Sequence, residues 1–181
     1  EAGIKKDFMG ERVKLGITFF YSEIKNFIQS GPGPNFVQDN FGEFHSQGLE
    51  TSINLKLPHD HSLSIHHTWN DHYLFEKTKS NHYQPGTRRP KHKLNANLSH
   101  NWDNGVESVV GLFIRGSAKG FDAANETPAF GTVRTALSYQ YDKNIKLTAR
   151  LENILDARAL EVGGFGYPGR SGYVGFVYTF N

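Results

Sequence analysis

Cysteine is absent from the 181 residues, and methionine occurs once. Without cysteine the chain forms neither disulfide bonds nor thiolate metal sites, and the redox compartment stays open. No stretch approaches the roughly 18 consecutive apolar residues of a membrane-spanning helix, and Val109–Ile114 is typical of the runs present. The formal net charge of +2 is too small to indicate a nucleic-acid partner. No nucleophile–base spacing, phosphate loop or paired-carboxylate signature indicates an enzyme.

Alternation of apolar with polar or small residues is the strongest pattern present. At the C-terminal end, Val174, Phe176, Tyr178 and Phe180 alternate with a face made largely of small or polar residues. Successive strand side chains point to opposite faces, so this is a strand with one apolar face. A soluble β-sandwich would need a second apolar layer. An apolar outside with a polar inside is typical of a strand between lipid and a watery lumen.

The same pattern predicts an all-β chain of about nine strands, of which the first is weak and short. The expected strands span residues 2–7, 13–21, 48–57, 63–69, 94–102, 106–114, 133–141, 147–152 and 173–180. The expected short turns are 9–12, 58–61, 103–105 and 142–144, and the expected long loops are about 30–43, 75–89, 117–130 and 154–169. Asn104-Gly105 is a strong hairpin signal. Strict alternation of short and long connections predicts an antiparallel up-and-down transmembrane β-barrel segment.

Aromatic residues support the same prediction, because they fall into two levels. Trp102, Tyr139, Tyr141, Tyr178 and Phe180 lie near the short turns, and Phe19, Tyr21, Trp69 and Tyr73 lie near the long loops. Two such bands are typical of the aromatic girdles at the membrane interfaces.

The C-terminal thirty residues also carry a family resemblance. Asn153-Ile154-Leu155-Asp156, Gly166-Tyr167-Pro168-Gly169-Arg170 and Tyr178-Thr179-Phe180 resemble the end of TonB-dependent outer-membrane receptors. Leu155 stands where the family usually has Phe, and Asn181 follows the Phe that is normally terminal. Looser likenesses occur at residues 1–5, 48–50 and 89–93.

The resemblance implies a parent barrel of about 22 strands with an N-terminal plug. Residues 1–181 would then be the C-terminal portion of the barrel, with the plug domain and the N-terminal strands absent. An odd number of strands fits this expectation, since single-chain bacterial barrels have even numbers. No signal peptide is present, because Glu1-Ala2-Gly3 begins within the alternating pattern, so we expect a fragment or processed piece.

The resemblance also implies a function, which is energised uptake of a scarce nutrient across the Gram-negative outer membrane. The nutrient would be siderophore-bound iron, haem, cobalamin or a similar compound, most often a metal chelate. Expected partners are outer-membrane lipid, the receptor's own plug, the TonB energy-coupling complex and the barrel-assembly machinery, with no cofactor and no covalent chemistry. Two alternatives stay open: a complete eight-stranded barrel with a structural or adhesive role, and a soluble β-sandwich that binds carbohydrate or is an enzyme.

Three groups of residues are candidates for these roles. Loop residues with aromatic or cationic groups are candidate ligand contacts: Phe36, Tyr83, Arg88, Phe121, Phe165 and Tyr167. Charged residues expected on the inner face would meet a plug or solvate the lumen: Glu50, Arg115, Arg134, Arg150 and Glu152. Gly175, Tyr178 and Phe180 resemble the terminal signal that the assembly machinery recognises, and an exposed edge strand suits recognition by strand addition.

Histidines crowd one predicted hairpin at positions 59, 61, 66, 67 and 72. Two histidines on one face of a strand suit Zn²⁺ or Cu²⁺. His66 and His67, however, point to opposite faces, and His59 and His61 lie in the turn. We therefore expect scattered polar histidines of the barrel and predict no metal site.

Overall fold

The computed structural model describes the chain except for residues 31–37, 77–81, 86–87, 121–125, 163 and 181. For residues 27, 29–30, 38–41, 75–76, 82–85 and 162 it describes the backbone only. Every described element is a β-strand or a turn. Within these limits, no helix has the length and apolar content needed to span a membrane.

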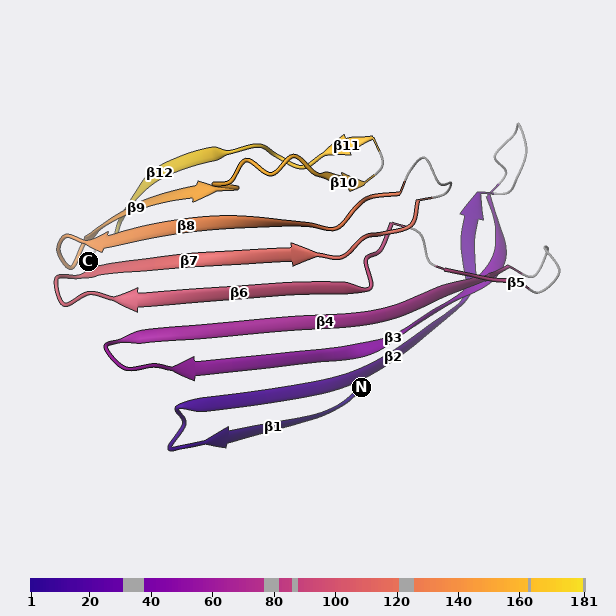
Figure 1. Ribbon diagram of the computed structural model, residues 1–181, viewed down its shortest axis with the longest axis horizontal. Helices are drawn as coiled ribbons and strands as arrows, with labels where there is room; N and C mark the ends of the chain where they lie inside the picture. Colours follow the sequence, from indigo (N-terminus) through magenta and orange to yellow (C-terminus); the bar gives the residue numbers. More distant parts are fainter. Residues whose placement is uncertain (31–37, 77–81, 86–87, 121–125, 163, 181) are drawn as a thin grey trace.

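Nine strands form one antiparallel path in which each strand pairs with its neighbours in sequence (Figure 1). They are β1 (Ala2–Phe8), β2 (Val13–Ser30), β3 (Gln38–Lys56), β4 (His61–Glu76), β6 (His92–Asn101), β7 (Val106–Arg115), β8 (Phe130–Gln140), β9 (Ile145–Glu152) and β12 (Ser171–Tyr178). The short β5 (His82–Pro85) pairs with β4, whereas β10 (Leu160–Val162) and β11 (Phe165–Gly166) form a separate ribbon. The predicted all-β, up-and-down segment is confirmed.

The sheet is open, with β1 at one edge and β12 at the other (Figure 1). Each of these two strands pairs along one side only among the described residues. One continuous sheet also replaces the two packed sheets that a β-sandwich requires. The strands are therefore part of a larger barrel, because unpaired strand edges are not tolerated in lipid.

The two faces of the sheet differ as the alternation predicts. Leu15, Ile17, Phe19 and other apolar side chains of the outer face are exposed. The buried side chains Ser46, His72, Arg115 and Thr132 all belong to the other set of alternating positions, which we call the inner face. Few apolar side chains are buried among the described residues, and Phe44 and Ala118 are two of them. Among the described residues, no second protein layer therefore covers the apolar outer face of the sheet.

Short turns follow the predicted chemistry. Gly105 has φ of +78°, and the Asn104 Oδ1 atom accepts a hydrogen bond of 3.3 Å from the Val106 N–H. In the last short turn the Asp142 Oδ1 atom accepts hydrogen bonds from the N–H groups of Asn144, at 2.7 Å, and Ile145, at 2.9 Å. These local contacts close the hairpins where the sequence places them.

Strand ends near the long loops are where the sequence-based boundaries are wrong. The described residues of the loop expected at 30–43 are strand, because β2 extends to Ser30 and β3 begins at Gln38. β4 likewise continues to Glu76, and short strands lie inside the loops expected at 75–89 and 154–169. Backbone pairing between β2 and β3 continues through register shifts between Ile24 and Ile28, where the apolar alternation has ended. Apolar residues alternate with polar ones only where one face of the strand meets lipid. Backbone pairing between strands has no such requirement, so it continues past the alternating part.

Candidate functional site

Cations gather on the inner face at the end that carries the long connections. One hollow of about 190 Å³ is lined by His72, Arg89, Lys91, Ser117, Ala118, Lys119 and Glu126. A second hollow of about 260 Å³ is lined by Thr68, Asn70, Arg88, Arg89, Pro90 and Lys93. Arg89 belongs to both linings, so we treat the two hollows as one site and call it the basic cleft.

Backbone contacts hold the cationic segments of the basic cleft together. The Asn70 N–H donates to the carbonyl of Lys91 at 2.8 Å, and the Arg88 N–H donates to the carbonyl of Lys119 at 2.6 Å. Arg88 has φ of +62°, a left-handed conformation that turns the chain sharply before the buried Pro90. The segment that enters β6 is therefore anchored both to β4 and to the connection after β7.

Charge in the basic cleft is strongly one-sided. Arg88, Arg89, Lys91, Lys93 and Lys119 line it, against one carboxylate, Glu126. The Lys91 Nζ atom lies 2.6 Å from the Asp71 Oδ1 atom, and the Arg89 guanidinium carbon lies 4.7 Å from the Phe44 ring centroid.

Lys93 lies directly opposite Arg115 across the β6–β7 pair. Like charges in directly opposite positions destabilise a sheet, so this arrangement costs stability. Such a site is suited to a polyanionic ligand.

Arg115 itself is only 5% exposed and is committed to the protein backbone. Its guanidinium donates to the carbonyls of Leu160 and Glu161 and, at 3.2 Å, to the Thr127 hydroxyl. It also lies 5.7 Å from the centroid of the Phe130 ring. Arg115 therefore lies on the inner face, as the sequence predicts, and it holds β10 against the end of β7.

The element Asn153–Asp156 closes the base of the last long connection. Asn153, which is 2% exposed, donates from Nδ2 to the carbonyls of Ala157, at 3.1 Å, and Pro168, at 2.9 Å. Its Oδ1 atom accepts the Ala157 N–H at 2.9 Å, and the Asp156 Oδ1 atom accepts the Arg170 N–H at 3.0 Å. Both residues have positive φ, of +48° and +52°. This element is a structural clamp that ties the two ends of the connection together.

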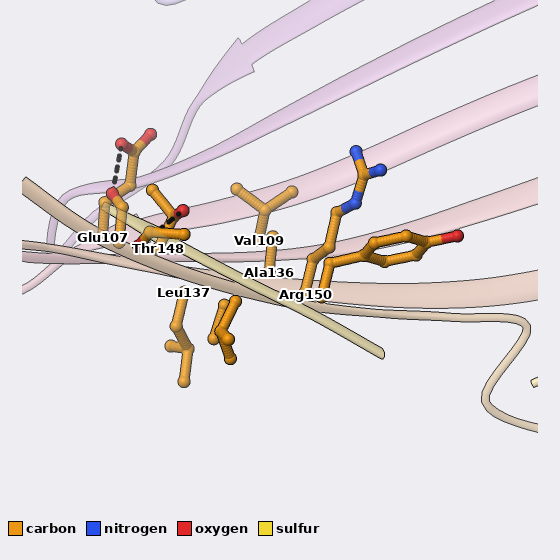
Figure 2. A pocket seen from close by; sticks show the side chains of 11 residues that line it. Glu107, Val109, Ala136, Leu137, Thr148 and Arg150 are labelled. Atoms are coloured by element: carbon orange, nitrogen blue, oxygen red, sulfur yellow. Dashed lines mark hydrogen bonds between the residues drawn. The ribbon is translucent and has the colours of Figure 1, made fainter. Parts of the chain in front are cut away.

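A wider groove of about 430 Å³ crosses the inner face of β7, β8, β9 and β12. Figure 2 shows Glu107, Thr148 and Arg150 on one side of the sheet and Leu137 on the other. The Arg150 guanidinium carbon lies 4.4 Å from the Tyr173 ring centroid, and its Nε atom lies 3.7 Å from a Glu152 carboxylate oxygen. The groove combines a small apolar floor at Val109 and Ala136 with charged walls.

Comparison with known proteins identifies the family. Residues 1–154 match the family model described as "TonB dependent receptor-like, beta-barrel". This chain belongs to the TonB-dependent receptors. The family consists of outer-membrane β-barrels of Gram-negative bacteria. The resemblance of the C-terminal thirty residues is confirmed as a family assignment.

This TonB-dependent receptor chain spans about a quarter of the length of the curated relative that it matches. The metal-pseudopaline receptor CntO of Pseudomonas aeruginosa is 26% identical over 170 residues, which cover 89% of this chain and 24% of that protein. The FrpB iron transporter of Neisseria meningitidis superposes with a TM-score of 0.80 at 11% identity, over 98% of this chain and 30% of that one. The siderophore receptor PiuA of Acinetobacter baumannii gives a TM-score of 0.72 at 20% identity, with coverages of 97% and 27%.

The predicted ligand-contacting loop residues of this receptor are only partly placed. Phe36 and Phe121 lie outside the described residues, and Tyr83 lies in β5 with an undescribed side chain. Arg88 lines the basic cleft. Phe165 is exposed on β11, and Tyr167 lies 5.1 Å, centroid to centroid, from Phe130. Of this set, the structure places Arg88 in a site suited to a ligand.

The predicted lumen-facing residues of this receptor all occupy inner-face positions. Glu50 lies opposite Thr18 and Thr68, and the Arg134 guanidinium donates to Asn97 Oδ1 at 3.0 Å. Arg150 lines the groove of Figure 2 from β9, and Glu152 lies two residues further along the same face of that strand. A contact between these residues and a plug stays a prediction.

The predicted assembly residues lie at the exposed edge of the sheet. Gly175 and Tyr178 belong to β12, which pairs with β9 along one side, and the exposed Phe180 follows it. The Tyr178 and Phe180 rings meet edge to face at 4.9 Å between centroids. Recognition of this strand by the assembly machinery stays a prediction.

Sequence reasoning missed the basic cleft, because the structure brings Lys119, which follows β7, next to the basic run that leads into β6. The neighbourhood 88–93 does contain five basic side chains, Arg88, Arg89, Lys91, His92 and Lys93, and this run is the signal that was available. A histidine contact was missed as well: the His67 Nε2 atom lies 3.2 Å from the His92 Nδ1 atom, across two strands.

Proposed function

We propose that this chain forms part of an outer-membrane receptor that takes up an anionic metal chelate. The observation that carries the proposal is the basic cleft, where five cationic side chains face one carboxylate at the loop end of the inner face. A metal chelate with several negative charges would neutralise cations that otherwise repel one another. Similar proteins include a metal-pseudopaline receptor and an iron transporter, and these support the same class of cargo.

In this proposal the ligand enters from outside the cell and meets the basic cleft before it reaches the lumen. Charge-assisted hydrogen bonds from Arg89, Lys93 and Lys119 would hold the chelate. The groove of Figure 2 would face the receptor's plug, with Arg150 and Glu107 available to polar groups of that domain. Plug, remaining strands and the contact with the energy-coupling complex would lie in parts of the protein beyond residues 1–181. Transport of this kind leaves the ligand covalently unchanged.

Ligand binding tests the proposal directly. The purified full-length receptor is titrated with a ferric tris-catecholate, which carries a net charge of −3, and with a neutral ferric tris-hydroxamate. We expect Arg89→Ala to weaken binding of the trianion by about tenfold to a hundredfold, since hydrogen bonds to charged groups contribute about 1.5–3 kcal/mol. Lys143→Ala, in the exposed turn at the opposite end of the sheet, is the matched control.

Two outcomes contradict the proposed function. Either the native receptor binds the neutral complex as tightly as the trianion, or Arg89→Ala and Lys143→Ala change the affinity equally.

Orientation in the membrane has its own test. A cysteine placed at Glu126, beside the basic cleft, should react with an impermeant thiol reagent on intact cells. A cysteine at Asn104, in a short turn, should react only after the outer membrane is permeabilised. Labelling of position 104 alone on intact cells would reverse the proposed orientation.

A further inference from the structure

Three metal-ligating side chains meet on the outer face of β2 and β3, beyond the part of the strands that carries apolar alternation. They are Glu23, Glu43 and His45. Phe19, Leu49 and Trp69 form a wholly apolar row across β2, β3 and β4, and Glu23 and His45 lie four residues further along their strands, with His45 directly opposite Tyr73. At about 3.3 Å per residue this is roughly 13 Å toward the long loops. The cluster therefore lies at the level of the upper tyrosines and on the opposite face of the sheet from the basic cleft.

Strand register is what brings the three side chains together. Glu23 lies directly opposite His45 across the β2–β3 pair. Glu43 precedes His45 by two residues, so both point to the same face. One ligand atom of each residue lies within 4.8 Å of those of the other two, and the His45 Nε2 atom lies 3.6 Å from a Glu43 carboxylate oxygen.

Two tyrosines orient the His45 ring from outside the cluster. The Tyr21 hydroxyl lies 3.1 Å from the His45 Nδ1 atom. The Tyr73 ring stacks on the imidazole, with centroids 4.9 Å apart and an angle of 9° between the planes. The Nε2 atom is thereby directed at the carboxylates. A histidine whose other nitrogen is held by a hydrogen bond is the usual arrangement of a metal ligand, because that bond sets the tautomer and the ring orientation.

Lys25 supplies the positive charge that two neighbouring carboxylates require. Its Nζ atom lies 3.2 Å from a Glu23 carboxylate oxygen. The lysine side chain is largely exposed, so it is free to leave when another cation arrives. A divalent ion bound here would compete with the Lys25 ammonium.

We propose that Glu23, Glu43 and His45 bind one divalent transition-metal ion, such as Zn²⁺, Ni²⁺ or Cu²⁺, on the outer surface of the receptor at the level of the upper tyrosines. One imidazole nitrogen with two carboxylate oxygens suits these ions, whereas Mg²⁺ and Ca²⁺ take oxygen ligands alone. The ion links β2 to β3 where apolar cross-strand pairs have ended. It is a clip between two strands, and it is separate from any cargo held in the basic cleft.

The test is a calorimetric titration of the purified full-length receptor in detergent with ZnCl₂ and with NiCl₂. We expect one site, with His45→Gln and Glu43→Gln each weakening the affinity at least tenfold. Lys25→Met should strengthen it several-fold, because the competing ammonium is gone. Hydrogen exchange of the β2–β3 amides near residue 45 should slow when Zn²⁺ is added to the native receptor.

Matched controls separate this site from other binders. His67→Gln removes a histidine from the other outer-face contact, and Arg89→Ala alters the basic cleft; both should leave Zn²⁺ affinity unchanged. Cu²⁺-loaded receptor should also show nitrogen coupling in electron paramagnetic resonance that His45→Gln abolishes. Variants are compared after heat-modifiability on a gel confirms that each is folded.

Three results overturn the proposal. One is a folded native receptor with no stoichiometric Zn²⁺ or Ni²⁺ binding. Another is displacement of Zn²⁺ by an equal concentration of Mg²⁺, which indicates only a diffuse acidic surface. The third is a loss of binding in His67→Gln that equals or exceeds the loss in His45→Gln.

Discussion

Neighbouring residues of β7 lie in two different environments, the outer face and the inner face of the sheet. Leu112, on the outer face, is 38% exposed, whereas Gly111 and Arg115, on the inner face, are buried. On the outer face the apolar side chains project with few protein neighbours, because lipid completes their packing. On the inner face the side chains are polar and held by specific contacts, such as the 3.0 Å hydrogen bond between Arg134 and Asn97. The outer face thus depends on the solvent around the protein, and the inner face depends on partners within it.

The largest expected effect comes from a charged substitution on the outer face. Leu112→Arg places a charge in the middle of a lipid-facing strand and should lower the free energy of unfolding by about 2–4 kcal/mol in a bilayer. Val109→Arg, on the inner face of the same strand beside the groove of Figure 2, is the matched control and should cost less. Folding titrations of both variants in lipid vesicles measure the difference, and equal penalties would contradict the assignment of faces.

Gly111 is an unsuitable inner-face control although it is adjacent to Leu112. A Cβ atom there would lie 2.6 Å from Arg134 Nε and 2.9 Å from Asn97 Oδ1. Any larger residue would displace this hydrogen-bonded pair. The inner face therefore has no space for a side chain at Gly111, whereas Val109 lines the groove of Figure 2.

A smaller effect is expected for the polar clamp. Asn153→Ala removes three hydrogen bonds at a buried position and should destabilise the protein by about 2–3 kcal/mol. Asp156→Ala removes one exposed hydrogen bond to the Arg170 N–H and should cost about 1 kcal/mol or less. Denaturant titration and proteolysis within residues 154–169 measure both, and an Asp156 variant that is the more damaged would contradict the clamp.

The smallest effect sharpens the comparison within the inner face. Ser46 is buried, and its hydroxyl donates to Asn70 Oδ1 at 2.8 Å, so Ser46→Ala should cost about 1 kcal/mol. The Ser138 hydroxyl lies 3.5 Å from a Glu107 carboxylate oxygen at an exposed position, and Ser138→Ala should change stability by less than about 0.5 kcal/mol. Unfolding free energies that rank these two variants in reverse order would show that burial does not govern the inner contacts.

Parts of this fold follow from the sequence because lipid imposes a period of two. Leu15 and Ile17 were assigned to the outer face of a strand because both neighbours of each residue are small or polar. Asn104-Gly105 marked a hairpin because its backbone needs positive φ. The sequence did not predict that β2 and β3 extend past the pair Tyr21–Gln47. Strand segments above the membrane carry polar residues on both faces, so their apolar residues do not recur at every second position. Their pairing rests on backbone hydrogen bonds that any residue except proline donates.

The sequence by itself determined the strand count of the main path, the two faces and the family, because alternation, turn chemistry and the C-terminal elements are all local. Only the tertiary structure decided which charges meet. Lys119 comes from a different segment than Arg89 and Lys93, and Glu23 faces His45 through the register of two strands that extend further than the sequence predicted. Such sites depend on which strands are neighbours and in which register. Pairing across the sheet sets the neighbouring strands and their register. The order of residues along one strand specifies neither of these.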